Sequence, residues 1–340
     1  MKNIRRGFLF KCFIFASMFA LLMSFSGTAG YADTIHVTTL SDDDGGSLRA
    51  AIASADSYDV ISFEVTGTII LDTELSIDHG LTIQGPGAED IAISGNDNCR
   101  VFNISRAESV DISGLSIVSG DAGGGNGGGI YNVSDKLTVE DVTFTGNSAK
   151  YGGGMYNASY SDPTVTNCTF TGNSATHDGA GMYNNNSSPT VTNCIFWGNT
   201  TEEIYNVSSS VPDLSFCVVQ SNDVGDGTTS NDIISADPKL QDPADNGGPT
   251  QTCALEEGSS AIDSGLTIGT ISTDQRGFAR PWPEGGSFDI GAYEYGAGED
   301  TPPDEDDDNG SVTSGGGCNL GLLSPMFPMI LLPLLLMLKK

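Results

Sequence analysis

The chain has 340 residues and is strongly acidic, with 44 Asp and Glu against 14 Lys and Arg and a formal net charge of −30. Such a charge repels nucleic acid and anionic lipid, so neither is expected as a partner. It also keeps an exported protein soluble. No cofactor is predicted, although the acidity is compatible with a scaffold stabilised by calcium.

Residues 1–32 predict a secretory signal peptide. The segment begins with basic Met1–Arg6, continues with apolar Phe8–Phe25 and ends with Gly30-Tyr31-Ala32, a small-x-small cleavage site. The apolar run is long for a signal peptide, so an uncleaved membrane anchor is the alternative. In both cases the sequence predicts export.

Residues 33–65 are expected to cap one end of the fold that follows. Ser47 stands before a helical apolar stripe formed by Leu48, Ala51, Ile52 and Ala55. A serine at this place is a favoured helix N-cap. The helix is short enough to lie across the end of a stack of strands and to cover the unpaired strand edge.

A family resemblance supports this cap. The stretch TIHVTTLSDDDGGSLRAAIASADSYDVISFEVTGTIIL, followed by LTIQGPG and AISGNDNCRVFNI, resembles the CSLREA-type module that precedes right-handed β-helix repeats in bacterial surface proteins. The leading cysteine of that module is replaced by Gly46, and its Arg-Glu-Ala appears as Arg49-Ala50-Ala51. The resemblance implies a bacterial surface protein whose β-helix begins after this module.

Residues 66–225 predict an all-β, right-handed parallel β-helix. Three nearly identical segments occupy residues 127–147, 152–173 and 179–199, and each has short apolar runs of period two. A unit of this size cannot bury its own apolar face, so the units must stack. Polar Asp141, Asn167 and Asn193 separate the apolar pairs and tolerate the left-handed backbone of a sharp corner.

The repeat register aligns polar and thiol side chains into columns. An interior thiol ladder is predicted from Cys168, Cys194 and Cys217, because residues in one column cannot surround a zinc ion tetrahedrally. An amide ladder that satisfies corner backbone groups is predicted from Asn147, Asn173, Asn199 and Asn222. Cys99 and Cys253 lie outside the thiol column, and the sequence leaves open whether they are free or paired.

An aromatic column is predicted on the outer surface. Each of its members follows an apolar residue on a strand, so alternation points it outward: Tyr131, Tyr156, Tyr183 and Tyr205. Rings repeated once per coil could offer a flat apolar strip to the sugar rings of a glycan. If the column faced inward, the tyrosines would be core residues.

Residues 226–295 are expected to close the β-helix. The stretches DPKLQDPADNGGPTQTCALEEGSSAIDSG, DQRGFARP and FDIGAYEY resemble the choice-of-anchor Q module found at the end of such helices. The charged residues of the last two stretches are Asp274, Arg276, Asp289 and Glu294. An internal ion-pair network is the expected role for them, and a ligand site is the alternative.

The end of the chain predicts attachment to the cell envelope. Residues 296–314 are acidic and rich in Pro and Gly, as in a disordered linker. In residues 315–340, Gly317 and Cys318 precede apolar Leu320–Leu338 and basic Lys339-Lys340. This order resembles the Synerg-CTERM sorting signal, which implies processing and attachment at Gly317 and Cys318. A plain transmembrane tail is the alternative.

Catalytic residues are not predicted. A polysaccharide lyase needs a cationic base or charge clamp near clustered carboxylates, but between Gly120 and Gln220 the only Lys or Arg residues are Lys136 and Lys150. His177, in the same stretch, is expected in a solvated loop. The sequence therefore favours a non-enzymatic, adhesin-like or structural protein at the bacterial cell surface or outer envelope, with a glycan or a host or matrix surface as partner. A pectate-lyase-like enzyme or a carbohydrate-binding module is the alternative.

Overall fold

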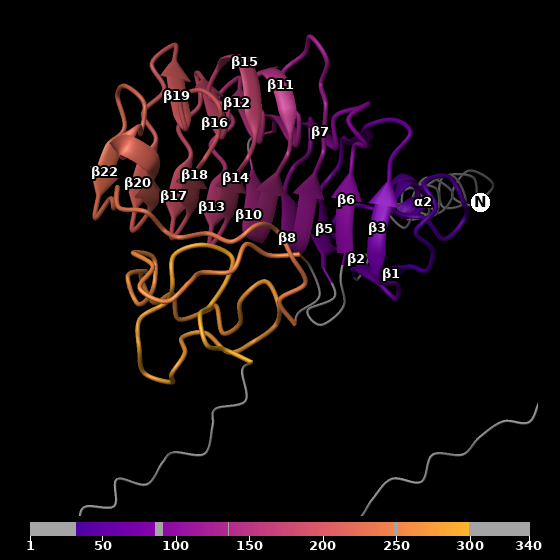
Figure 1. Ribbon diagram of the computed structural model, residues 1–340. Helices are drawn as coiled ribbons and strands as arrows, with labels where there is room; N and C mark the ends of the chain where they lie inside the picture. The colour runs from indigo at the N-terminus through magenta and orange to yellow at the C-terminus, as the bar shows by residue number, and fades with distance from the viewer. Residues whose placement is uncertain (1–31, 86–90, 135, 248–250, 299–340) are drawn as a thin grey trace, which may run out of the picture. The chain divides into compact units, whose positions relative to one another are not determined.

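The computed structural model describes residues 32–85, 91–134, 136–247 and 251–298 (Figure 1). Most of the predicted signal peptide lies outside these ranges, as do the predicted linker beyond residue 298 and the sorting segment with Gly317 and Cys318. Within these ranges no helix is long and apolar enough to cross a membrane.

Parallel strands from successive coils form the largest sheet. Neighbouring coils pair in register, as in Val139 with Ile112 and Phe144 with Phe170. The main path of this sheet contains β1 (Thr34–Val37), β2 (Asp59–Phe63), β5 (Leu81–Gln84), β8 (Val110–Val118), β10 (Leu137–Thr145), β13 (Thr164–Thr166), β17 (Thr190–Thr192), β20 (Asp213–Ser215) and β22 (Thr229–Asn231). Its side branches contain β3 (Gly67–Ile70), β6 (Ile91–Ser94), β14 (Thr169–Thr171), β18 (Ile195–Trp197) and β21 (Val218–Val219).

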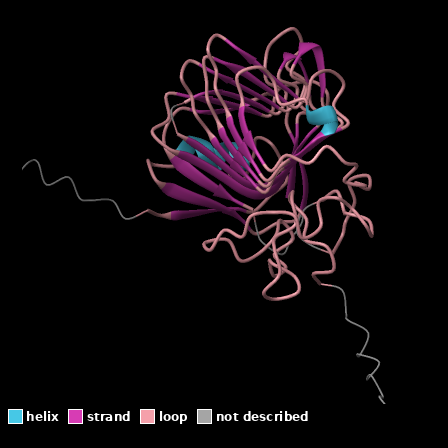
Figure 2. Ribbon diagram, turned by 90° about the vertical axis from the view of Figure 1, so that its left-hand side faces the viewer, coloured by secondary structure: helices cyan, strands magenta, loops and turns pink. Residues whose placement is uncertain are grey.

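Two further parallel sheets form the other walls of the coils. One contains β4 (Leu75–Ile77), β7 (Phe102–Ser105), β9 (Ile130–Val133), β12 (Met155–Ala158), β16 (Met182–Asn185) and β19 (Ile204–Val207). The other contains β11 (Ser148–Tyr151) and β15 (Ser174–Asp178). Figure 2, seen from the β22 end, shows the strands arranged around the axis of the stack. The predicted right-handed parallel β-helix is confirmed.

The corners of the coils lie where polar residues interrupt the apolar pattern. Asp141, Asn167 and Asn193 have φ values of 51°, 51° and 53°, in the left-handed region that Asn and Asp tolerate better than most residues. Asn167 and Asn193 turn the chain between two strands of the same coil without reversing it, and Asp141 lies at the equivalent position within β10.

The interior contains stacked aromatic rings. Phe144, Phe170 and Phe196 are fully buried, and their ring centroids are 4.4 and 4.5 Å apart with nearly parallel planes. They lie 26 residues apart in the sequence, so each coil contributes one ring at the same position. The stack joins the coils into one continuous apolar core.

A short helix caps the N-terminal end, as predicted. α2 (Leu48–Ser54) buries Leu48, Ala51 and Ile52 in the core at the β1 end of the stack, and the Ser47 hydroxyl accepts a hydrogen bond of 3.1 Å from the amide of Ala50 (Figure 1). Within the predicted cap region, β1 and β2 already belong to the main sheet. At the other end β22 extends that sheet beyond residue 225.

The C-terminal region lies beside the coils instead of across their end. The Ser116 hydroxyl donates to the carbonyl of Gln251 at 2.8 Å, and the amide of Ala292 donates to the Thr169 hydroxyl at 3.1 Å. Gly291 lies so close to the sheet that a Cβ there would be 2.7 Å from Ile195 Cδ1. The expectation that residues 226–295 close the end is therefore wrong in its placement, because small outward side chains on the sheet let the region pack along the side. Figure 2 shows these loops against one side of the coils.

Two arginines hold the C-terminal region together internally. Arg276 donates to Asp274 Oδ2 at 2.9 and 2.7 Å, and its guanidinium lies 3.7 Å from the Tyr293 ring centroid. Arg280 lies 3.4 Å from Glu294, and both side chains are completely buried. The predicted Arg276 and Asp274 thus form one internal ion pair, and Glu294 forms another with Arg280, whereas the Asp289 carboxylate accepts from the backbone amides of Asp263 and Tyr295.

Candidate functional site

The asparagine column is an interior amide ladder with one change from the prediction. Asn147 Nδ2 donates to Asn173 Oδ1, and Asn173 Nδ2 donates to Asn199 Oδ1, both at 2.9 Å. The next position belongs to buried Glu203, which accepts from Asn199 Nδ2. Asn222 is wrongly included in the predicted ladder, because it is exposed in a 3-10 turn, η1 (Gln220–Asn222), that leaves the repeat path.

A second amide ladder was missed by the sequence analysis. It runs beside the tyrosines on the six-stranded sheet, with hydrogen bonds of 3.3, 3.0 and 2.9 Å between successive side chains: Asn132, Asn157, Asn184 and Asn206. The signal is present in the sequence, because the dipeptide Tyr-Asn recurs in four coils. It follows that both walls of the coils are tied by polar as well as apolar columns.

The three cysteines occupy one buried column. Each sulfur donates to a carbonyl of the preceding coil, with distances of 3.7 Å from Cys168 to Val139 and 3.6 Å from Cys194 to Val165 and from Cys217 to Val191. All three are free thiols, and burial raises the pKa of Cys194 well above its ordinary value. Cys99 and Cys253 are also unpaired. These thiols are placed for packing.

The tyrosine column lies outside the coils but does not form a flat strip. Tyr131, Tyr156, Tyr183 and Tyr205 stack face to face, with centroids 5.4, 5.2 and 5.5 Å apart. The two central rings are only 6% and 8% exposed. Each ring face is therefore covered by the next tyrosine, and a sugar ring has access to the faces only at the ends of the stack.

One end of the tyrosine stack is already occupied. The guanidinium of Arg100 lies 5.0 Å from the Tyr131 centroid, and Arg100 Nη1 donates to Glu74 Oε2 at 2.5 Å. Arg100 also donates to the carbonyls of Asn126 and Gly127. The chain thus closes this end with its own cation.

The other end opens into an acidic cavity of about 370 Å³ beside Tyr205. It is lined by Glu202, Ile204, Tyr205, Asn206, Asn222, Asp223, Val224, Gly225 and Asp226. Burial raises the pKa of Asp223, the Glu202 charge adds to this, and the amide of Glu203 opposes it by donating at 3.1 Å. Tyr205 is therefore the predicted glycan-contact residue with an open cavity beside it.

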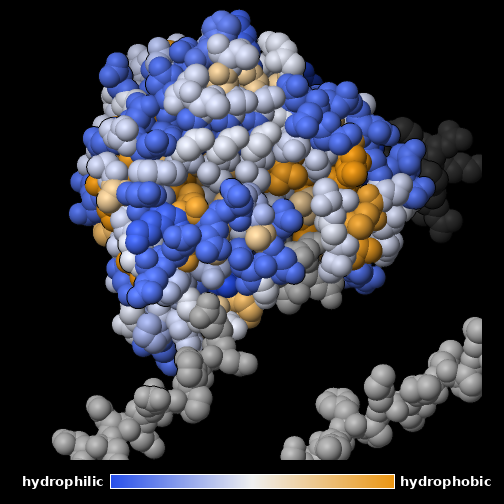
Figure 3. Space-filling view, viewed as in Figure 1, coloured by the Kyte–Doolittle hydropathy of each residue, from blue (hydrophilic) through white to orange (hydrophobic). Residues whose placement is uncertain are grey.

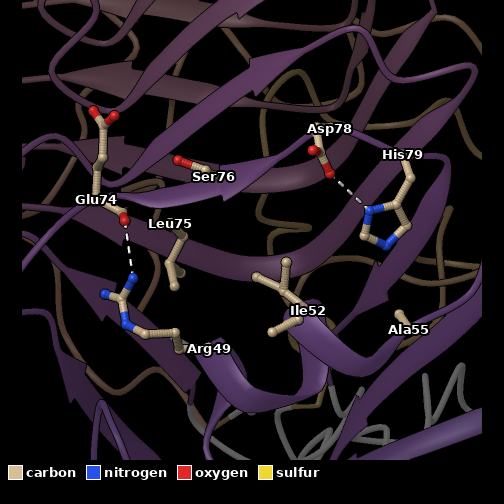
Figure 4. Close-up of a pocket in the computed structure, with 9 residues that line it drawn as sticks. Arg49, Ile52, Ala55, Glu74, Leu75, Ser76, Asp78 and His79 are labelled. Carbon is tan, nitrogen blue, oxygen red and sulfur yellow. Dashed lines mark hydrogen bonds and ion pairs between the residues drawn. The ribbon is translucent and has the colours of Figure 1, made fainter.

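A cavity of about 340 Å³ lies between α2 and β4, and Arg49 at its edge connects the helix to the coils (Figure 4). Arg49 donates to the carbonyl of Glu74 at 3.0 Å and to both carboxylate oxygens of Asp42 at 3.0 and 2.9 Å. His79 Nδ1 lies 3.1 Å from Asp78 Oδ1. Figure 4 shows Arg49 reaching the backbone of Glu74, whose carboxylate points away from it. The Arg49 contacts hold the capping helix.

The outer face of the main sheet brings carboxylates near an arginine. A cavity of about 200 Å³ is lined by Asp111, Ile112, Ser113, Thr138 and Glu140. Burial raises the pKa of Glu140, and the nearby positive charge of Arg280 lowers it. The Arg280 side chain, however, is completely buried and donates to the carbonyls of Asp289 and Gly291. Arg280 therefore has no surface to offer a substrate.

Metal ligands do not gather in the described residues. No three His, Cys, Asp or Glu side chains there form a group that could hold a metal ion. His177 is exposed and belongs to β15 rather than to a loop, with its ring 5.1 Å from that of Tyr151.

A family comparison supports the fold of the coils. A family model described as a right handed beta helix region matches residues 69–232. Among solved structures, the chain is similar to jun a 1, the major allergen from cedar pollen, with 15% identity, a TM-score of 0.39 and coverage of 62% of this chain and 78% of the allergen. It is also similar to pectate lyase Pel9A, with 12% identity, a TM-score of 0.37 and coverage of 78% and 97%. No curated protein matches. The matched region of the chain is a right-handed parallel β-helix.

Proposed function

We propose that this protein is a non-catalytic rod displayed at a bacterial cell surface, where it acts as an adhesin-like or structural element. The observation that carries the proposal is the continuity of its side-chain columns. Phenylalanine, cysteine, asparagine and tyrosine columns each bond or stack from one coil to the next. A stack tied in this way resists bending and suits a protein that must hold a surface at a fixed distance.

The surface of the coils also suits display. The face in Figure 3 is mostly hydrophilic or neutral in colour, and its main apolar area lies at the right, over the N-terminal coils. Outward residues of β13 and β17 are threonines, of which Thr164 and Thr190 are exposed. Such a face can contact a hydrated glycan or matrix surface by hydrogen bonding without promoting aggregation.

The burial of Arg276 and Arg280 in internal ion pairs favours a non-catalytic role. The Arg280 charge acts on Glu140 of the main sheet, but the Arg280 side chain is buried against Glu294. Arg276 is held by Asp274 and two aromatic rings. A lyase mechanism would need such a cation at the solvent-facing side of the carboxylates.

A polysaccharide panel tests this role with the full-length protein. Binding and the release of unsaturated products are measured in parallel. We expect binding to at least one neutral polysaccharide of the panel without any unsaturated product. Turnover that is lost in Glu140→Gln, but kept in the surface control Asp213→Asn, would replace this proposal with a lyase acting on the main sheet.

Surface attachment rests on the sequence of the two ends. The signal peptide precedes the rod, and an acidic linker leads to Gly317, Cys318, an apolar segment and Lys339-Lys340. Processing near Cys318 should leave the rod attached to the envelope. Intact mass of surface-extracted protein decides this, with Cys318→Ala expected to release the protein or to accumulate the precursor. A mature chain that still carries residues 320–340 would instead identify a plain membrane tail.

A further inference from the structure

The two ends of the tyrosine stack have matching chemistry except for one group. At the N-terminal end, Tyr131 has a guanidinium over its ring, from Arg100. The carboxylate of Glu74 accepts from Arg100 at 2.5 Å and from the side-chain amide Nδ2 of Asn103 at 2.8 Å. This end therefore combines an aromatic face, a carboxylate, an amide and a cation.

The C-terminal end has the first three components, but none of the described residues that line it is a Lys, Arg or His. Tyr183 covers one face of Tyr205, and the following turn of chain forms the cavity of about 370 Å³ beside the ring. In the sequence there is no Lys, Arg or His between His177 and Lys239. The polar side chains that line the cavity are Glu202, Asp223, Asp226, Asn206 and Asn222.

The negative charge in this cavity is only partly compensated. Asp223 is partly buried and accepts one hydrogen bond, from the Glu203 amide at 3.1 Å. Burial raises the pKa of Asp223, and the charge of Glu202 raises it further. The face of an aromatic ring carries partial negative charge, so the ring and the carboxylates favour the same kind of ligand.

We propose that this cavity binds the guanidinium of an arginine side chain from a partner protein, which stacks on Tyr205 and pairs with the carboxylates of Glu202 and Asp226. A guanidinium is planar, stacks on aromatic faces and donates to several acceptors at once, as Arg100 does at the opposite end. A second copy of this acidic chain is a poor partner because like charges repel. The inference adds a binding site to the proposed role but does not depend on surface display.

The test uses full-length protein and two small probes in ligand-observed NMR titrations. The probes are acetyl-arginine-amide and acetyl-citrulline-amide, which have similar shapes but differ in charge. We expect saturable binding of the arginine probe and at least a tenfold weaker response from the citrulline probe. Tyr205→Leu should weaken arginine binding by about two- to fivefold. The double variant Glu202→Gln/Asp226→Asn should weaken it by about tenfold.

Two matched variants separate this site from general acidity. Asp213→Asn removes an exposed acid on another sheet, and Tyr131→Leu changes the opposite end of the stack, so both should leave binding of the arginine probe unchanged within about twofold. Equal binding of the two probes, or an equal loss in Asp213→Asn and in the double variant, would overturn the proposal. Because the titration uses purified protein, its outcome is independent of whether Cys318 is processed.

Discussion

The Thr143 hydroxyl donates a hydrogen bond of 2.7 Å to Gln275 Oε1, which lies 132 residues further along the chain. Gln275 Nε2 also donates to the Ser116 hydroxyl at 3.1 Å and to the carbonyl of Leu115 at 3.3 Å. One buried amide therefore bonds to two successive coils and fixes the C-terminal region against the side of the β-helix.

Gln275→Leu should loosen this region without unfolding the coils. The substitution leaves the buried hydroxyls of Ser116 and Thr143 without these partners, which should cost about 2 to 3 kcal/mol. Hydrogen exchange should then increase in residues 251–298 and stay unchanged in β12 and β16. Gln251→Ala is the control, because Gln251 contributes its carbonyl and not its side chain. Unchanged exchange in Gln275→Leu would contradict this role.

Phe170→Ala should destabilise the stack of coils by about 3 to 5 kcal/mol, because it leaves a cavity between two phenylalanine rings. Urea unfolding followed by circular dichroism measures the loss. Tyr160→Ala changes an aromatic residue that is 73% exposed and should have little effect. A loss below about 1 kcal/mol would mean that neighbouring coils collapse into the space.

Asn173→Ala should show the strength of the interior amide ladder. The Asn173 side chain makes four hydrogen bonds, two of them to Asn147, one to Asn199 and one to the carbonyl of Phe144. Its loss leaves several buried groups unpaired and should cost about 3 kcal/mol or more. Asn222→Gly, which keeps the left-handed backbone at the exposed position, should change stability by less than about 0.5 kcal/mol. Similar losses in both variants would place Asn222 in the ladder.

Stability should fall as the pH rises through neutrality. Burial raises the pKa of Asp141 to about 8, of Glu203 and Glu294 to about 7, and of Asp289 to about 6. The folded protein thus binds more protons than the unfolded chain, so this contribution is complete below about pH 4 and is lost progressively until the pH has passed the folded-state pKa values of about 6 to 8. Urea midpoints between pH 4 and 9 should show the decline.

Asp141→Asn should reduce the part of this decline that occurs near pH 8. The variant copies Asn167 and Asn193, which occupy the same corner in the following coils, and so fits the left-handed backbone. Asp213→Asn, at an exposed position, should leave the pH profile unchanged. Stability that increases between pH 5 and 9 would contradict the role of these carboxyl groups.

The coils could be predicted from the sequence because their spacing is regular. The 26-residue separation of Phe144, Phe170 and Phe196 identifies positions that pair in register, and the corner residues adopt the expected left-handed backbone. Alternation also placed the tyrosines on the outside correctly. It did not indicate that the small rise per coil brings each ring face onto the next and leaves no open strip.

The end of the amide ladder, the packing of the C-terminal region and the cavity beside Tyr205 could not be predicted, because they do not follow the repeat pattern. Asn222 has a similar spacing to the ladder residues, but its neighbours form a 3-10 turn and Glu203 takes the place expected for it. The outward-pointing residues Ser116, Thr143 and Thr169 are buried, but their sequence pattern is the same as that of solvent-facing strand residues. The sequence therefore does not indicate that the C-terminal region covers them. The cavity beside Tyr205 likewise arises where the last coil deviates from the others.

The lateral position of the C-terminal region limits how the length of this protein can change. Residues 251–292 bond to Ser116, Thr143 and Thr169, one in each of three consecutive coils. Duplication of a coil between Ser116 and Thr169 would shift these partners by about 4.8 Å and break the match, whereas duplication before β8 would leave it intact. The C-terminal region thus fixes the number of coils between Ser116 and Thr169. Evolutionary variation in the number of coils is expected on the N-terminal side of β8.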